Sequence, residues 1–120
     1  MASNIFPRSA RILSTEEYDK VFKKPVRASE PGVLVLACKN DKEGSRLGLI
    51  VPKKVLKRAV WRNRIKRIAR ETFRQNQHSL PNIDLVILAR PKIEEKSNSE
   101  LREVFIRLWR QISHRLENKQ

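Results

Sequence analysis

Apolar and polar positions along the chain fall into blocks that predict the order helix, strand, strand, strand, helix, strand, helix. The helical blocks repeat apolar residues at spacings of three and four, and the strand blocks are short apolar runs bounded by turn residues. This order predicts an α+β two-layer sandwich, in which helices cover a four-stranded mixed sheet. A chain of 120 residues has the size of one ordinary domain, so we expect residues 1–120 to form a single domain.

The first predicted helix spans roughly residues 15–23 and ends before Pro25. The preceding Ser14-Thr15-Glu16-Glu17 has the form of a capping box, in which the serine and the last glutamate satisfy each other's backbone N–H groups. One face of this helix carries Tyr18, Val21 and Phe22.

Three strands are predicted before the middle of the chain. A strand at 26–29 and an apolar run at 33–38 flank Glu30-Pro31-Gly32, which has the composition of a turn. A polar loop then leads to a strand at 46–51, which we expect to pair back antiparallel on the run at 33–38. Gly48 within this strand indicates a bulge or a close approach to the backbone.

The second half of the chain alternates helix, strand, helix. At about 100° per residue, a helix over 59–76 has one apolar stripe made of Trp61, Ile65, Ile68, Ala69 and Thr72, with Phe73 at its edge. The strand at 84–89 is expected to pair parallel with 46–51 unless another strand intervenes. A capping box at Ser97-Asn98-Ser99-Glu100 opens a helix to about residue 116, whose core stripe is Leu101, Val104, Phe105, Leu108, Trp109, Ile112 and Leu116.

Charge indicates a binding protein. The chain has 27 Lys and Arg against 13 Asp and Glu, a net charge of +14. Nucleic acid is the leading partner, because neutralised phosphates release condensed counterions. A membrane surface is the alternative, but the sequence has neither an apolar run near 20 residues nor a lipidation motif. Between Lys53 and Arg74 ten residues are Lys or Arg and one, Glu71, is acidic, so the charge is concentrated.

The predicted 59–76 helix has a nearly all-positive arc opposite its apolar stripe, formed by Arg62, Asn63, Lys66, Arg67, Arg70 and Arg74, with Arg64 and Glu71 further round. Cations at i, i+4 and i+8 repel one another by about a few tenths of a kcal/mol per pair. A solvated face normally mixes both signs, so this arc favours RNA or DNA as a partner that relieves the repulsion. Arginine forks match phosphate, and Asn63 adds an amide that donates and accepts.

Tyr18 and Phe22 are a second candidate contact. Aromatic side chains one helical turn apart can stack on single-stranded bases, each stack contributing about 1–3 kcal/mol. The alternative is that both pack the first helix onto the sheet. Spacing alone favours this core role.

The sequence contains no recognisable active site. His78 and His114 are far apart, neither has a carboxylate at a suggestive spacing, and there is no phosphate loop, metal triad or nucleophile elbow. Cys38 is the single cysteine, so we expect a small buried apolar residue in a reducing compartment. Residues 1–15 lack the apolar core of a signal peptide, and we expect a cytoplasmic protein.

The motif that is most specific is Arg62-Asn63-Arg64-Ile65-Lys66-Arg67, preceded by Leu47-Gly48-Leu49-x-Val51-x-Lys53-Lys54 and by Ala59-Val60. Related positions extend outward to Phe6-Pro7-Arg8, Arg11-x-Leu13, Tyr18, Val21-Phe22, Arg70-Glu71-x-Phe73-Arg74, and Asp84-x-Val86 followed by Ala89. Over nearly its whole length the chain thus closely resembles the bacterial ribonuclease P protein subunit family.

The resemblance implies that the holoenzyme removes the 5′ leader from precursor tRNA. Its RNA subunit is the catalyst and uses bound Mg²⁺. The protein has no active site or cofactor of its own, raises substrate affinity and specificity, and binds as one protein per RNA. The implied contacts with the catalytic RNA are Lys53, Lys54, Arg58, Arg62, Asn63, Arg64, Lys66, Arg67, Arg70 and Arg74.

The resemblance also implies a cleft for the single-stranded leader between the first helix and the sheet, at Arg11, Tyr18, Phe22 and Leu36. Leu36 is aliphatic where some family members have an aromatic residue nearby. The family's strand–helix–strand crossover is left-handed, although about 98% of such units are right-handed.

Two other classes are weighed against this hypothesis. A ribosomal or generic RNA-binding protein explains the charge, but not the combination of basic helix, aromatic pair and extended motif. A protein nuclease requires a catalytic constellation that the sequence does not offer.

Overall fold

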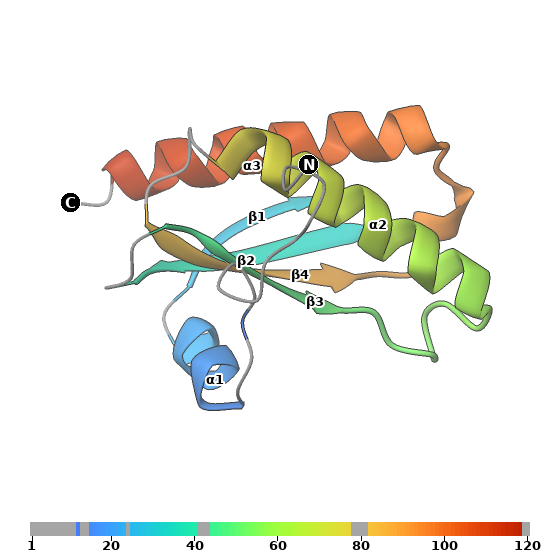
Figure 1. Ribbon diagram of the computed structural model, residues 1–120, viewed down its shortest axis with the longest axis horizontal. Helices are drawn as coiled ribbons and strands as arrows, with labels where there is room; N and C mark the ends of the chain where they lie inside the picture. The colour runs from blue at the N-terminus through green and yellow to red at the C-terminus, as the bar shows by residue number, and fades with distance from the viewer. Residues whose placement is uncertain (1–11, 13–14, 24, 41–43, 78–81, 119–120) are drawn as a thin grey trace, which may run out of the picture.

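The computed structural model describes residues 12, 15–23, 25–40, 44–77 and 82–118. The elements follow the predicted order (Figure 1), and they are α1 (Thr15–Lys23), β1 (Val26–Glu30), β2 (Val33–Lys39), β3 (Arg46–Ile50), α2 (Ala59–Asn76), β4 (Ile83–Ala89), a short 3-10 helix η4 (Ile93–Glu95) and α3 (Asn98–Asn118). The α+β class is confirmed. Within the described residues no helix combines the length and apolarity needed to cross a membrane.

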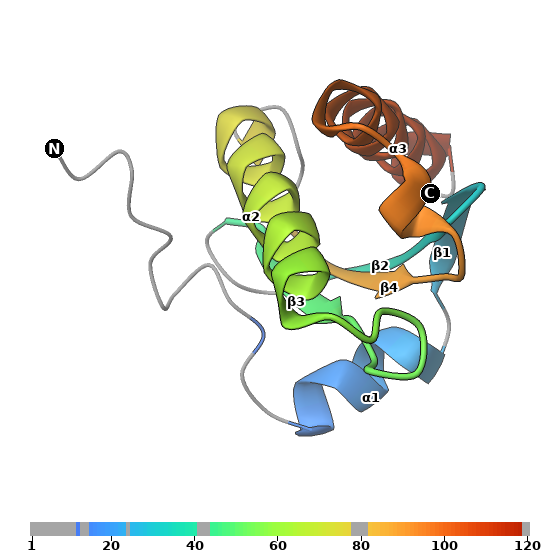
Figure 2. The same cartoon turned by 90° about the vertical axis from the view of Figure 1, so that its right-hand side faces the viewer.

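The strands form one four-stranded mixed sheet in the order β1-β2-β4-β3. β2 pairs antiparallel with β1 and β4, whereas β3 and β4 are parallel. α2 and α3 lie side by side on one face, and the short α1 covers part of the other (Figures 1 and 2). Seen from the α2 side with β3 and β4 running upward, β4 lies to the left of β3, so the β3–α2–β4 crossover has the expected left hand.

The predicted antiparallel pairing of the 46–51 strand with the 33–38 strand is wrong, because β4 lies between them. Leu36 of β2 is in register with Val86 of β4, which is in register with Gly48 of β3. β4 is buried over nearly its whole length, whereas β3 is half-buried at both ends. A strand that is apolar on both faces buries the most apolar surface at the centre of a sheet. β4 therefore takes the central position, and the more polar β3 lies at the edge.

Alternation along the strands divides the core into two clusters. Val35 and Ile87 belong to the larger cluster beneath α2 and α3, and Leu36 and Val86 belong to a smaller one beneath α1. The predicted stripes are buried on α2 at Ile65, Ile68, Ala69, Thr72 and Phe73, and on α3 at Leu101, Val104, Phe105, Leu108, Trp109, Ile112 and Leu116. Trp61 is half-buried at the margin.

The capping box predicted at the start of α3 is present. The Ser97 backbone N–H donates to Glu100 Oε1 at 2.9 Å, and the Glu100 N–H donates to Ser97 Oγ at 3.1 Å. The backbone hydrogen bond is the main reason why the pKa of Glu100 is lowered. Ser14, in the equivalent box predicted before α1, lies outside the described residues.

Candidate nucleic-acid interface

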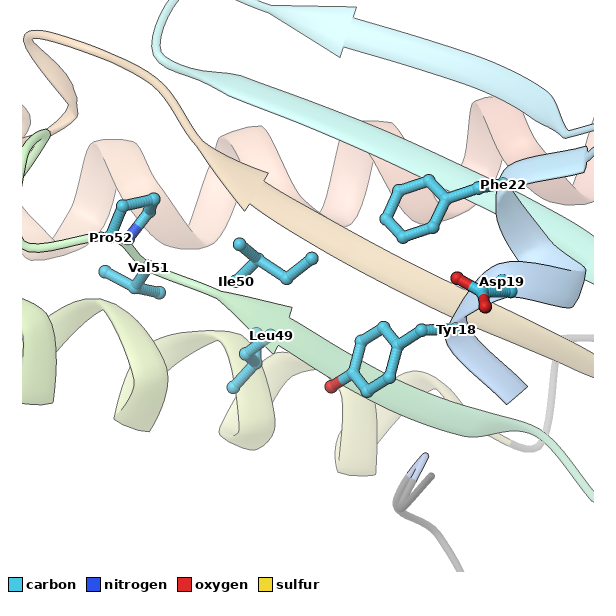
Figure 3. Close-up of a pocket in the computed structure, with 7 residues that line it drawn as sticks. All are labelled: Tyr18, Asp19, Phe22, Leu49, Ile50, Val51 and Pro52. Carbon is cyan, nitrogen blue, oxygen red and sulfur yellow. The ribbon is translucent and has the colours of Figure 1, made fainter. Parts of the chain in front are cut away.

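An open groove lies between α1 and the C-terminal end of β3 (Figure 3). It has a volume of about 580 Å³ and is lined by Tyr18, Asp19, Phe22, Leu49, Ile50, Val51 and Pro52. The Tyr18 ring projects from α1 over β3, and the Phe22 ring projects from α1 on the side of β4 and β2 (Figure 3). Phe22 is 40% exposed although it is a large apolar side chain. Two rings facing an aliphatic wall form a surface suited to flat apolar groups such as bases.

Gly48 fixes the distance between α1 and the sheet. A Cβ atom at this position would lie 2.7 Å from the ring of Tyr18, closer than real Cβ contacts come. The tyrosine therefore rests on bare backbone, which confirms the close approach predicted at Gly48. Tyr18 also packs against the small cluster that contains the buried Val21, so it is partly a core residue and at the same time lines the groove.

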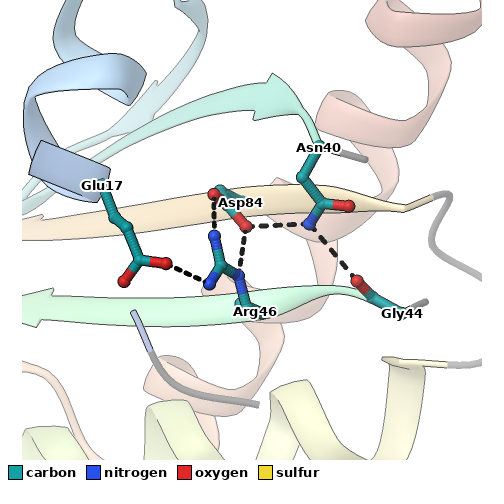
Figure 4. Close-up of polar contacts among 5 residues, drawn as sticks. All are labelled: Glu17, Asn40, Gly44, Arg46 and Asp84. Carbon is teal, nitrogen blue, oxygen red and sulfur yellow. Dashed lines mark hydrogen bonds and ion pairs between the residues drawn. The ribbon is translucent and has the colours of Figure 1, made fainter. Parts of the chain in front are cut away.

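A buried polar network anchors the first turn of α1 (Figure 4). Arg46 of β3 donates through Nε and Nη2 to the two carboxylate oxygens of Asp84, at 2.9 and 2.7 Å, and through Nη1 to Glu17 of α1. Asn40 Nδ2 donates to the same carboxylate at 2.8 Å. The Asp84 side chain is 1% exposed, so these donors replace the water that it loses. The hydrogen bonds to Asp84 are the main reason why the pKa of Arg46 is raised.

The structure brings together two of the residues expected at the leader site, Tyr18 and Phe22. Leu36 is 6% exposed and packs in the cluster beneath α1, where it supports the helix and does not line the groove. Arg11 lies outside the described residues. Sequence reasoning missed Asp19 and the wall from Leu49 to Pro52, because the end of an apolar strand has the same pattern whether it faces a core or a groove.

Four exposed side chains of α2 form a ridge with spacings of three and four, made of Val60, Asn63, Arg67 and Arg70. Arg62 and Lys66 are half-buried on one flank of this ridge, and Arg64 and Glu71 are half-buried on the other. Glu71 pairs with Arg102 of α3 at 3.3 Å. The predicted cationic arc is therefore real, with Asn63, Arg67 and Arg70 outermost and Arg74 half-buried toward its end.

The loop between β3 and α2 joins this ridge to the groove. Lys53 and Lys54 are exposed directly after Pro52, which lines the groove. Arg58 is exposed just before α2, and its guanidinium lies 5.2 Å from the centre of the Trp61 ring, a cation–π distance. The groove is thus followed directly along the chain by the cationic surface, which we define as Lys53, Lys54, Arg58 and the cationic arc of α2.

Two residues expected to contact RNA donate hydrogen bonds inside the protein. Arg62 Nη1 donates to the carbonyl oxygens of Leu56 and Lys57 at 2.8 and 3.1 Å. Arg64 Nη1 donates to Lys96 O at 2.9 Å and to Asn98 Oδ1, at the first residue of α3, at 2.8 Å, and its Nη2 donates to Glu94 O of η4 at 3.1 Å.

Among the described residues, the other titratable candidates do not assemble into a site. His114 is exposed on α3, and His78 lies outside the described residues. Cys38 is half-buried, and burial raises the pKa of its thiol. Among the described residues no group of three His, Cys, Asp or Glu side chains could hold a metal ion.

A small, strongly basic α+β protein with a cationic helix on one face of its sheet and an open aromatic groove at the other (Figure 2) has the features of the class of nucleic-acid-binding proteins. A family model described as Ribonuclease P matches residues 6–113. The ribonuclease P protein component of Vibrio campbellii is 46% identical over 113 residues, which cover 94% of this chain and 96% of that protein. That of Pseudoalteromonas translucida is 46% identical over 110 residues, 92% of this chain and 79% of that protein. The chain therefore belongs to the family of ribonuclease P protein components.

Solved structures agree with this assignment. The ribonuclease P protein of Thermotoga maritima, in complex with 1-(4-fluorophenyl)-2-thiourea, is 31% identical with a TM-score of 0.77, over 85% of this chain and 99% of that one. The ribonuclease P protein of Staphylococcus aureus has a TM-score of 0.80 at 24% identity, over 87% of this chain and 97% of that one. The second comparison shows that the fold is shared.

Proposed function

We propose that this chain is the protein subunit of ribonuclease P and that it binds two RNAs through adjoining surfaces. The observation that carries the proposal is the junction of groove and cationic surface, where Pro52 lines the groove and Lys53 and Lys54 follow it. The surface around α2 contacts the catalytic RNA. The groove holds the single-stranded 5′ leader of precursor tRNA.

The chemistry of the groove suits bases better than phosphates. Tyr18 and Phe22 offer rings on which bases stack, each stack contributing about 1–3 kcal/mol. The carboxylate of Asp19 lies on the same wall and repels phosphate, so a bound strand turns its bases toward α1. Mature tRNA has no leader, and this contact therefore favours the substrate over the product.

The chemistry of α2 suits a folded RNA. The cationic arc of α2 from Asn63 to Arg74 extends about 16 Å at 1.5 Å per residue, and a rigid helix presents its guanidinium groups to phosphate as a fixed array. Neutralising phosphates releases counterions, so binding weakens as salt rises. The cations also reduce the repulsion between the catalytic RNA and its substrate, which lowers the Mg²⁺ concentration that the RNA needs.

The protein acts by binding and the RNA subunit does the chemistry. The Mg²⁺ ions belong to the RNA, one protein binds one RNA, and the complex matures tRNA in the cytoplasm. Within this account Lys53, Lys54, Arg58, Asn63, Lys66, Arg67, Arg70 and Arg74 face the catalytic RNA.

Reconstitution tests the proposal. Labelled precursor tRNA is incubated at low Mg²⁺ with the protein alone, with the catalytic RNA alone and with both. We expect 5′-leader removal only with both, and cleavage by the RNA alone once Mg²⁺ is raised. Cleavage by the protein alone would indicate a protein nuclease, and an RNA whose activity the protein does not change would refute the subunit role.

A further inference from the structure

The two arginines of the Arg62-Asn63-Arg64 motif point away from the exposed ridge of α2. Asn63 is exposed, whereas Arg62 and Arg64 are half-buried on opposite flanks of the helix. Each is two positions from the other, which places them about 200° apart around the helix axis. Their guanidinium groups therefore reach different neighbouring segments.

Arg64 reaches the connection between β4 and α3. Its guanidinium bridges Glu94 O and Lys96 O in that connection and Asn98 Oδ1 at the first residue of α3, at distances from 2.8 to 3.1 Å. A fork that spans three acceptors fixes a segment more firmly than one hydrogen bond does. The same connection carries three cations, Arg90, Lys92 and Lys96, and two acids, Glu94 and Glu95, so it adds one net positive charge beside α2.

Arg62 contacts a second segment, the loop before α2, on the other flank of the helix. It donates to Leu56 O and Lys57 O, at the end of the loop that carries Lys53 and Lys54. Each motif arginine thus holds a cation-bearing segment against the basic helix. Charges on segments that are already ordered bind a polyanion without an additional ordering cost.

We propose that Arg62 and Arg64 are positioning residues, which hold the 52–58 loop and the 90–98 connection beside α2 and so widen one helix into a three-segment cationic surface for structured RNA. This inference rests on the proposed function. Direct phosphate contact is assigned instead to the exposed ridge, with Arg67 as its central example.

The test compares Arg64 with Arg67. The affinity of the full-length protein for the catalytic RNA is measured for Arg64→Ala, Arg64→Lys, Arg67→Ala and Arg67→Lys, together with amide hydrogen exchange of residues 93–98 in the free protein. Lysine keeps the charge but has a single nitrogen in place of the planar guanidinium fork, so it cannot reproduce contacts that Arg64 makes through both Nη1 and Nη2. We expect both Arg64 variants to bind roughly 3- to 10-fold more weakly and to exchange faster at 93–98, since the released connection then has to be ordered when RNA binds.

Arg67→Ala should also bind more weakly, but Arg67→Lys should recover most of the affinity, and neither should change exchange at 93–98.

Asn98→Ala removes one acceptor of Arg64 without changing any charge, and it should weaken binding in the same direction. It also replaces Arg64→Ala as the test if that variant does not fold. Wild-type affinity in Arg64→Lys, or unchanged exchange in Asn98→Ala, would overturn the inference. Failure of the wild-type protein to bind the catalytic RNA would instead refute the proposed function.

Discussion

Arg46 joins three elements with one side chain, since it lies on β3, forks onto Asp84 of β4 and donates to Glu17 of α1. Beside it Gly48 leaves the space that the ring of Tyr18 occupies. The sequence pattern predicted a bulge or a close approach at Gly48 because glycine is unusual inside a strand. They could not find the Arg46 network, because its partners are 29 and 38 positions away and meet only in the correct strand register.

Replacing Arg46 by methionine should destabilise the protein strongly. The change keeps much of the aliphatic volume but leaves the Asp84 carboxylate buried with fewer donors, and breaking a buried pair on one side costs about 3–5 kcal/mol. Urea unfolding of Arg46→Met and of Arg46→Met with Asp84→Leu measures this. We expect the double variant to be more stable than the single one. A loss below about 1 kcal/mol in the single variant would mean that the network does not anchor the fold.

Replacing Gly48 by alanine should disturb the groove. The new methyl group would lie 2.7 Å from the Tyr18 ring, so the ring and α1 must move away from the sheet. We expect weaker binding of a single-stranded leader oligonucleotide by the reconstituted holoenzyme, and unchanged affinity for the catalytic RNA. Gly44→Ala is a comparison in which the methyl group meets no atom within 4 Å, although the backbone there has a φ of +107°. Equal leader affinity in wild type and Gly48→Ala would contradict the role given to this contact.

At the scale of elements, local patterns predicted α1 and α2 to their ends, because a periodic apolar stripe and its flanking breakers belong to one segment. The neighbour of β3 was not predictable in this way. Strand pairing depends on segments that are distant in the sequence. β4 lies at the centre of the sheet because it is apolar on both faces. Arg62 and Arg64 illustrate the same limit, since helical spacing gives their angle around α2 but not the loops that they reach.

α3 is tied to the edge strand β1 by a pair that responds to pH. Arg107 donates through Nε and Nη2 to both carboxylate oxygens of Glu30, each at 2.7 Å, and these hydrogen bonds lower the pKa of Glu30 from its usual 4.5. A carboxyl group whose pKa is lower in the folded than in the unfolded state stabilises the folded protein at pH values above its unfolded-state pKa. This stabilisation is lost as the pH falls through the folded-state pKa.

The stability difference between wild type and Glu30→Gln should therefore depend on pH. We expect wild type to have the larger free energy of unfolding at pH 7 and the difference to shrink below pH 4.5, as the carboxyl protonates. Thermal or urea unfolding between neutral and acidic pH gives the curve, and Glu95→Gln, at an exposed acidic residue of η4, is the control. A difference that is constant over this range would show that the ion pair does not contribute through charge.

At the scale of the whole molecule, the sheet separates two tasks. α2 and its flanking segments lie on one face, α1 and the groove lie at the other, and the loop after β3 joins them (Figure 2). The sequence predicted the cationic residues and the aromatic pair from charge and spacing. It could not predict that Leu36 is covered by α1 or that residues 49–52 form the facing wall, because both depend on where a short helix rests on the sheet.

The most direct measurement of the central claim is the affinity of the reconstituted holoenzyme for precursor and mature tRNA, with wild-type protein, Phe22→Ala and Val60→Ala. Phe22 and Val60 are both large exposed apolar side chains, but Phe22 lines the groove and Val60 lies on the α2 ridge. We expect Phe22→Ala to weaken precursor binding by about 1–3 kcal/mol, the value of one lost base stack, and to leave mature tRNA unaffected. Val60→Ala should not discriminate between the two tRNAs. Equal losses for precursor and mature tRNA in Phe22→Ala would contradict the claim that the groove holds the leader.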